Sequence, residues 1–223
     1  RDFTANVSHE LKTPLTSISG YAEIIREGMV KSEDVGRFAG KIYEEAQRLI
    51  TLVEDILNLS HLDEGAPGQE RRQGIDLYAL CERAVASLAE AARQRGIAIS
   101  LTGSRQRVDG AEKLLAEIIF NLCDNAIKYN QENGHVAVSV PREGDRVVLT
   151  VQDTGIGIPP GETDRVFERF YRVDKSHSKA SGGTGLGLSI VKHAVQYHHG
   201  DIRLTSKPGE GTVIRITFPA AAQ

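Results

Sequence analysis

Apolar positions in the first part of the chain alternate at spacings of four and three residues, which is the spacing of a heptad seam. The seam of the first segment consists of Leu11, Leu15, Ile18, Ala22, Ile25 and Met29. The second segment repeats the spacing at Ile42, Ala46, Leu49, Val53 and Ile56. The pattern predicts two amphipathic helices, residues 1–27 and 32–62, joined by a short turn into an antiparallel hairpin. Because such a hairpin cannot cover both of its apolar stripes alone, we expect residues 1–64 to form a homodimer as a four-helix bundle.

The rest of the chain has a different pattern. Residues 65–74 are polar and contain Pro and Gly, which predicts a linker. Beyond the linker, the periodicity predicts helices at residues 75–95, 111–130 and 184–199, and strands at 97–102, 107–108, 136–140, 147–153, 201–206 and 212–219. Antiparallel strands with helices gathered on one face form an α/β two-layer sandwich, so residues 75–220 predict a second domain.

Composition excludes several classes of protein. Charged residues make up 26% of the 223 residues and apolar residues 40%, which is ordinary for a soluble globular protein. The net charge of -3 comes without a basic stripe interleaved with aromatic residues, so we expect no nucleic-acid partner. Cys81 and Cys123 lack the spacing of metal ligands, and we expect both to be reduced core residues.

His9 lies in the segment Ser8–Leu15 but off the apolar seam, so its imidazole is expected to face solvent. An exposed imidazole can accept a phosphoryl group when one ring nitrogen is free and a partner orients the proton on the other. The adjacent Glu10 can serve as that base. Pro14 removes a backbone hydrogen bond and is expected to bend the helix beside His9. The alternative is a surface histidine without a function.

Three polar side chains share one face of the predicted helix 111–130, because Asn121, Asn125 and Lys128 lie at offsets of zero, four and seven. Amide oxygens suit a hard cation such as Mg²⁺, and the lysine can meet phosphate oxygens. Asp153 follows an alternating strand, where its carboxylate can accept a hydrogen bond from an exocyclic amine such as that of adenine. Taken separately, the three polar side chains are explained equally well as an ordinary helix surface, and the segment at Asp153 as an ordinary turn.

The glycine-rich segment Gly182–Ser189 opens a predicted helix, where glycines expose backbone N–H groups to phosphate. It is not a Rossmann fingerprint, because no strand leads directly into it, and it lacks the Gly-Lys-Ser/Thr ending of a Walker A loop. The preceding stretch, Arg172–Ser181, is rich in Ser, Lys and Asp, which suits a flexible lid over a bound nucleotide.

Together, these motifs resemble those of the sensor histidine kinases of two-component systems, over essentially the whole chain. The segment Ser8–Leu15 resembles the H box of that family. The other motifs follow in the order of the family: Phe120–Tyr129 resembles the N box, Asp153–Gly157 the G1 box, Val166–Arg172 the F box, Gly183–Gly187 the G2 box and Gly209–Thr212 the last glycine motif. The segment Phe3–Leu15 is most similar to Gram-positive membrane kinases of the phosphate-sensing or cell-envelope type.

The resemblance implies that the α/β sandwich is an ATP-binding domain of the Bergerat, or gyrase-like, fold. It implies that the protein uses ATP and Mg²⁺ to phosphorylate His9, with Glu10 as the base. The phosphoryl group would then pass to an aspartate in the receiver domain of a response regulator. Thr13 would orient water when the protein dephosphorylates that partner.

The resemblance also implies the residues that hold the cofactors. Asn121 and Asn125 would bind Mg²⁺. The nucleotide would contact Asn121, Asn125, Lys128, Tyr129, Asp153, Gly155, Gly157, Arg172, Gly183, Thr184, Gly185, Leu186, Gly187 and Thr212. This soluble chain would be the cytoplasmic portion of a bacterial protein anchored in the membrane by an upstream segment.

Two other interpretations compete with the histidine kinase. A gyrase-like ATPase or serine kinase module shares the nucleotide site but leaves His9 and the heptad hairpin unexplained. Gyrase-type ATPases place a glutamate base where Asn121 stands, and an amide cannot deprotonate water, so ATP is expected to persist until it meets the histidine. A helical docking module with a vestigial nucleotide pocket has no need of Asn125, Asp153 and Gly185.

Overall fold

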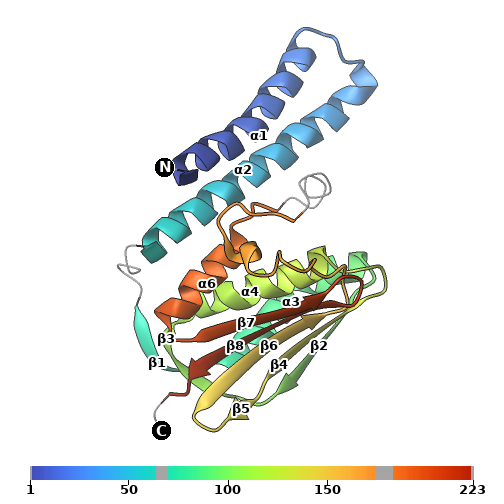
Figure 1. Ribbon diagram of the computed structural model, residues 1–223. Helices are drawn as coiled ribbons and strands as arrows, with labels where there is room; N and C mark the ends of the chain where they lie inside the picture. The colour runs from blue at the N-terminus through green and yellow to red at the C-terminus, as the bar shows by residue number, and fades with distance from the viewer. Residues whose placement is uncertain (1, 64–69, 174–182, 222–223) are drawn as a thin grey trace.

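A computed structural model describes residues 2–63, 70–173 and 183–221. Its first part is a hairpin of two long antiparallel helices, α1 (Asp2–Arg26) and α2 (Val35–Asp63), joined by a turn and a short 3₁₀ helix, Ser32–Asp34 (Figure 1). Gly28 takes the left-handed conformation, with φ of 69°, that ends a helix without steric strain. The predicted hairpin is therefore confirmed. Within the described residues, no helix combines the length and the hydropathy that crossing a bilayer requires.

The second part is an α/β sandwich whose sheet has its helices on one face (Figure 1). The strands run in the order β2 (Ala98–Gly103), β4 (His135–Val140), β6 (Arg146–Asp153), β8 (Gly211–Pro219) and β7 (Asp201–Lys207), with the short β5 (Arg142–Glu143) beside β6. The helices are α3 (Leu77–Gln94), α4 (Glu112–Lys128) and α6 (Gly187–Tyr197). The predicted two-layer sandwich is confirmed. The strands were all expected to pair antiparallel, and the neighbours β4–β6, β6–β8 and β8–β7 do so, but β2 pairs parallel with β4.

The core lies between the sheet and the helices, as the alternating pattern of the strands requires. Inward-facing positions on β4 and β6 are fully buried, and so is the apolar stripe of α4: Val136, Val138, Val140, Leu149, Leu115, Ile118, Ile119 and Leu122. Cys81 and Cys123 are free thiols within this core, and burial raises the pKa of Cys123 to about 12. Both cysteines thus act as small apolar residues.

The boundary between the two parts differs from the prediction. Residues 71–74 of the predicted linker and the first residues of the predicted helix 75–95 form a strand, β1 (Arg71–Asp76), which pairs antiparallel with β3 (Arg107–Ala111). The strand has no alternating apolar pattern; it is held by its pairing with β3 and by Asp109, which accepts a hydrogen bond from the Gly74 N–H at 2.7 Å. Helix α3 then begins at Leu77. Glu70 precedes the strand, and residues 65–69 of the predicted linker lie outside the described residues.

The hairpin rests on the α/β part through one half of α2, which lies across α6 (Figure 1). Leu52, Leu59 and Leu62 on this face of α2 are buried and join the core cluster of the second part. Their spacing of seven and three residues places them on one stripe of the helix. The hairpin and the sandwich are therefore joined by an apolar contact as well as by the chain.

Candidate functional site

His9 is exposed on α1, with 81% of its side chain accessible, as its position off the heptad seam predicts. Its Nδ1 lies 3.9 Å from Oε1 of Glu10, so the acid is placed beside one of the two ring nitrogens. The Thr13 hydroxyl, one turn further along the same helix face, donates to the carbonyl oxygen of His9 at 3.2 Å. Pro14 lies inside α1, and the helix continues through it to Arg26 without interruption.

The two predicted metal ligands, Asn121 and Asn125, face the first turn of α6. A Cβ atom on Gly187 would lie 2.9 Å from Oδ1 of Asn121 and 3.9 Å from Nδ2 of Asn125, so only glycine fits this approach. The Asn121 amide donates to the carbonyl of Glu117 at 3.0 Å, which directs its oxygen toward α6. Amide oxygens in this position suit a hard divalent cation.

Lys128 also lies at this end of α4, where its ammonium forms an ion pair of 2.7 Å with Asp124. The pair joins residues four apart on a helix and is partly exposed, so it contributes less than about 1 kcal/mol to the free energy of folding. An anionic ligand can therefore draw the lysine away from Asp124 at small cost.

Asp153, at the end of β6, is held by backbone N–H groups of the loop that follows it and of strand β8. Its Oδ1 accepts hydrogen bonds from Gly155 at 2.8 Å and from Thr212 at 3.2 Å. Burial raises the pKa of this carboxyl, and the two backbone donors act in the opposite direction. Gly155 packs against the backbone of Tyr129 so closely that a Cβ atom would overlap with its carbonyl oxygen.

Sequence reasoning missed a set of polar residues that supports the Asp153 loop. Asn130 is 7% exposed, and its amide donates to the carbonyl of His135 at 3.1 Å while accepting from the Thr154 hydroxyl at 3.2 Å. Gln131 donates to the carbonyl of Gly155 at 3.2 Å. Buried polar groups have to be hydrogen-bonded, and here these bonds fix the backbone on both sides of Asp153. Gly155 and Thr154 each lie 24 residues from their partners Gln131 and Asn130, so the sequence carried no local signal for these bonds.

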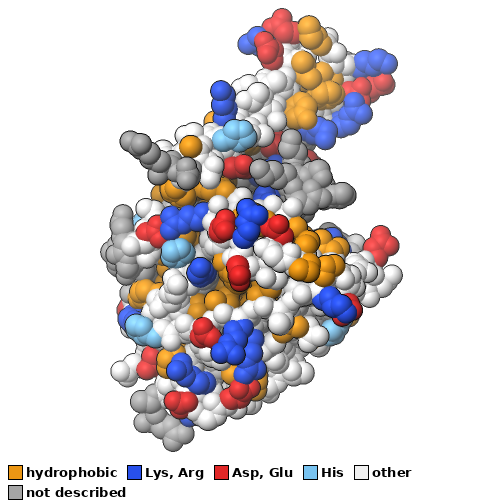
Figure 2. All heavy atoms as spheres, in the orientation of Figure 1, with side chains coloured by type: hydrophobic (Ala, Val, Ile, Leu, Met, Phe, Trp, Pro, Cys, Tyr) orange, Lys and Arg blue, Asp and Glu red, His pale blue; other side chains and the backbone are white. Residues whose placement is uncertain are grey.

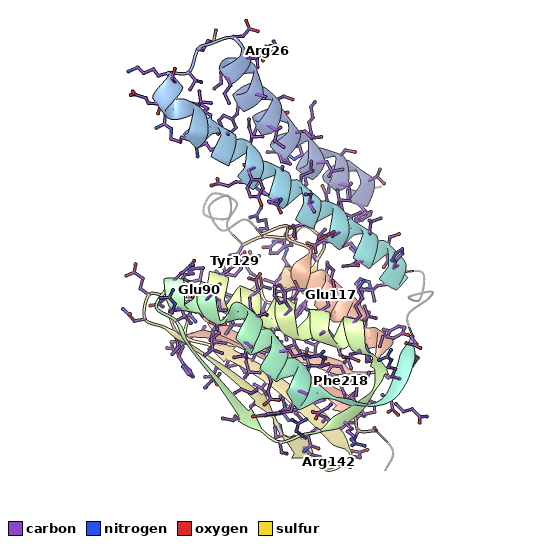
Figure 3. The ribbon with its side chains drawn as sticks, turned by 180° about the vertical axis from the view of Figure 1, so that it is seen from behind. Arg26, Glu90, Glu117, Tyr129, Arg142 and Phe218 are labelled. Atoms are coloured by element: carbon purple, nitrogen blue, oxygen red, sulfur yellow. The ribbon has the colours of Figure 1, made fainter. Side chains whose placement is uncertain are left out.

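Of the predicted phosphate-binding segment, Gly182–Ser189, residues Gly183–Leu186 form a loop, the predicted phosphate loop, which leads into the N-terminus of α6 and lies against Tyr129. A Cβ atom on Gly183 would lie 3.2 Å from the Tyr129 hydroxyl and 3.9 Å from Nη2 of Arg172. Figure 3 shows Tyr129 at the end of α4 beside the segment that leads into α6. Gly185, with φ of 74°, accepts a hydrogen bond from the N–H of Phe170 at 2.9 Å. The loop is not helical, so α6 starts at Gly187 and not at residue 184 as predicted.

The predicted nucleotide residues therefore fall into two groups that meet at Tyr129. One group surrounds the start of α6 and contains Asn121, Asn125, Lys128, Arg172, Gly183, Thr184, Gly185, Leu186 and Gly187. The other lies at the ends of β6 and β8 and contains Asp153, Gly155, Gly157 and Thr212. Tyr129 accepts a hydrogen bond from Ile156 at its carbonyl and approaches Gly183 with its hydroxyl. The predicted lid, beyond residue 173, lies outside the described residues.

The hairpin segment around His9 is close to the first group. Phe3 of α1 packs against Phe170 with ring centroids 5.8 Å apart, and the Arg169 guanidinium lies 5.1 Å above the Phe3 ring. Burial lowers the pKa of Arg172, and the negative charge of Glu10 acts in the opposite direction, which places Glu10 within electrostatic range. The exposed imidazole and the loop of α6 thus belong to one region of the molecule.

Two family models match the chain. The family described as histidine kinase-, DNA gyrase B- and HSP90-like ATPase matches residues 110–222, and the His Kinase A (phospho-acceptor) domain matches residues 1–65. The sensor-like histidine kinase SenX3 of Mycolicibacterium smegmatis is 41% identical over 220 residues, which are 98% of this chain and 57% of that protein. The sensor histidine kinase WalK of Bacillus subtilis is 39% identical over 223 residues, 98% of this chain and 36% of that protein. The chain thus spans about half the length, or less, of these relatives.

Solved structures share the fold. Full-length ShkA, solved in complex with AMPPNP, is 27% identical, with a TM-score of 0.71 over 100% of this chain and 46% of that one. The histidine kinase AdeS of Acinetobacter baumannii is 23% identical, with a TM-score of 0.78 over 95% of this chain and 97% of that one. At this sequence identity, the similarity to AdeS concerns the fold alone.

Proposed function

The chain belongs to the sensor histidine kinase family, and from this premise we propose that it phosphorylates its own His9 with ATP and transfers the phosphoryl group to an aspartate of a response regulator. One observation carries the proposal: an exposed imidazole with a carboxylate at Nδ1 lies in the same region as a glycine loop at a helix N-terminus. A hydrolase needs a base for water at the position of Asn121, and an amide cannot supply it.

The chemical step follows from the arrangement around His9. Nε2 attacks the γ-phosphorus of ATP, a nitrogen–phosphorus bond forms, and the bond to the oxygen bridging the β- and γ-phosphates breaks, releasing ADP. The attack leaves the ring positively charged, and Glu10, beside Nδ1, stabilises that charge and takes the Nδ1 proton. Phosphoryl transfer requires little more of the protein than positioning and charge neutralisation.

The remaining residues bind and orient the substrate. In this proposal, Asp153 accepts a hydrogen bond from the adenine amine, with its carboxylate held by the backbone N–H of Thr212. Backbone N–H groups of the loop Gly183–Leu186 and the Lys128 ammonium receive the phosphates. The amide oxygens of Asn121 and Asn125 fit Mg²⁺, which when bound neutralises charge on the phosphate oxygens.

The acceptor is tested with labelled ATP and Mg²⁺. We expect the wild-type protein to take up an acid-labile, alkali-stable phosphate, because phosphohistidine has that stability. His9→Gln should abolish the label while ATP binding persists. His61→Gln, which changes an exposed histidine at the end of α2, is the matched control and should keep the label. A label retained in His9→Gln would exclude His9 as the acceptor.

We further propose that the protein dephosphorylates its response regulator, with Thr13 orienting the attacking water. Thr13 lies one turn from His9 on the same face. Thr13→Ala should leave autophosphorylation unchanged and slow regulator dephosphorylation by about 10- to 100-fold, the usual loss when a reactant is misplaced. Thr16→Ala is the control, because the Thr16 hydroxyl likewise bonds to a backbone carbonyl one turn earlier, that of Lys12. Equal loss of both activities in Thr13→Ala would reject this role.

A homodimer through residues 1–64 and an upstream membrane anchor stay predictions.

A further inference from the structure

A carboxylate of the hairpin is bound to the predicted phosphate loop. Asp55 of α2 accepts a hydrogen bond at 2.6 Å from the hydroxyl of Thr184, the second residue of that loop. The same hydroxyl accepts from the N–H of Leu186 at 3.3 Å, so the contact involves the backbone that leads into α6. The carboxylate therefore lies beside the segment that leads into the N-terminus of α6, the end of a helix where negative charge is favoured.

The groups around Asp55 are those assigned above to the phosphates of the nucleotide. The Thr184 hydroxyl and the positive charge of Lys128 both stabilise the ionised carboxyl, whereas burial, the largest influence, raises its pKa. Glu54 is a further source of negative charge that acts against ionisation. A triphosphate at the loop would meet the same hydroxyl and the same ammonium, with Asp55 as an additional repulsive charge.

Asp55 is held in this position by the contacts on either side of it. Asn58, one turn further along α2, donates to Glu117 of α4 at 2.9 Å, and Figure 3 shows Glu117 on the side of α4 that faces α2. At the end of the helix, Asp63 pairs with Arg169 at 2.6 Å. Leu59, between them, is fully buried. The carboxylate is thus part of a packed contact between the hairpin and the ATP-binding domain.

We propose that Asp55 determines nucleotide affinity, as an internal anion that competes with the phosphates of ATP and ADP for the loop Gly183–Leu186. Docking of α2 on the loop and binding of a nucleotide then oppose each other. By linkage, a nucleotide weakens the docked contact by the same factor by which the contact weakens the nucleotide. The inference rests on the proposed function, since it takes this loop as the phosphate site.

The experiment measures the affinity of the whole chain for ADP with Mg²⁺, and for adenosine, by calorimetry. Asp55→Asn keeps an oxygen that accepts from Thr184 and removes the charge. We expect it to bind ADP about 5- to 20-fold more tightly than wild type, as a unit charge a few ångströms away implies, with adenosine affinity unchanged. Asp55→Ser should act in the same direction. Glu54→Gln removes the same charge from the neighbouring exposed residue and should leave ADP affinity within about twofold of wild type.

Two outcomes would overturn the inference while leaving the proposed function intact. In the first, Asp55→Asn binds ADP no more tightly than Glu54→Gln does. In the second, ADP and adenosine affinities rise together, because competition for phosphate cannot act on a ligand that has none. A wild-type protein that binds neither ADP nor adenosine, with Asp55→Asn equally inactive, would overturn the proposed function and this inference together.

Discussion

His198 carries no predicted role, yet it joins two of the helices that hold the site. It is 2% exposed, and its Nε2 accepts a hydrogen bond at 3.0 Å from the backbone N–H of Ala111, just before α4. Because a backbone N–H can only donate, the ring proton must lie on Nδ1, which donates to the carbonyl of Ala194 at 2.7 Å. The neutral imidazole therefore fixes the end of α6 to the start of α4.

This arrangement predicts that the protein loses stability as the pH falls. Burial lowers the pKa of His198 below its ordinary value of about 6.5, so the unfolded chain takes up a proton before the folded one does. The histidine thus costs no stability above pH 6.5, and below it the free energy of unfolding should drop by up to about 1.4 kcal/mol per pH unit. Urea denaturation between pH 8 and pH 5 measures this slope.

The comparison is with His198→Gln, which should show a shallower slope. The pKa of His193 is also lowered, mainly by burial and in addition by Arg169. Because His193 is present in both proteins, it contributes equally to the pH dependence of stability in both. His61→Gln, at an exposed position of α2, should keep the wild-type slope. An unchanged slope in His198→Gln would mean that other groups carry the pH dependence.

Residue positions were predictable where a periodic pattern or a short motif fixed them. The exposure of His9 follows from its offset against the heptad seam, and Asp153 follows from its place at a strand end. Asn130 and Thr154 were not predictable, because their hydrogen bonds link loops 24 residues apart. The same is true of Asp55, whose partner Thr184 lies 129 residues along the chain. Long-range polar contacts leave no periodicity in the sequence.

At the scale of the elements, prediction succeeded for segments that carry their own apolar pattern. The hairpin helices and the strands β4, β6, β7 and β8 have such patterns, and each appears close to its predicted bounds. β1 has none, because it is stabilised by its partner β3, so its residues resemble a linker. The predicted start of α6 at residue 184 is too early, and the helix begins at Gly187. Glycines compatible with the start of a helix also permit the loop that precedes it.

At the scale of the whole molecule, part of the apolar hairpin surface is not covered by any other described residue. Figure 2 shows hydrophobic side chains gathered on the end of the hairpin that projects from the ATP-binding domain. On α2, the exposed apolar residues Tyr43, Ile50 and Leu57 follow each other at intervals of seven. This stripe is separate from the buried face that carries Leu59. A sustained heptad stripe open to solvent is typical of a helix that packs against another helix.

We therefore expect the chain to dimerise through this stripe, and a pair of charges in it to separate the subunits. Ile50 and Leu57 are each about half exposed in the single chain, so covering both contributes roughly 1.5–3 kcal/mol in total. The double variant Ile50→Glu/Leu57→Glu should raise the dimer dissociation constant at least about 100-fold, because it loses that burial and also forces carboxylates against apolar side chains. Multi-angle light scattering across a dilution series measures this.

The control for the dimer experiment is Thr51→Glu, which adds a carboxylate to an exposed polar position of α2 between the two. It should remain dimeric. In the proposed arrangement the nucleotide is bound by residues of one chain, so the monomeric double variant should still bind ADP. A double variant that stays dimeric would exclude the stripe as the interface, whereas a monomer without ADP affinity would show that the nucleotide site needs the second subunit. The two measurements together separate assembly of the hairpin from binding at the ATP-binding domain.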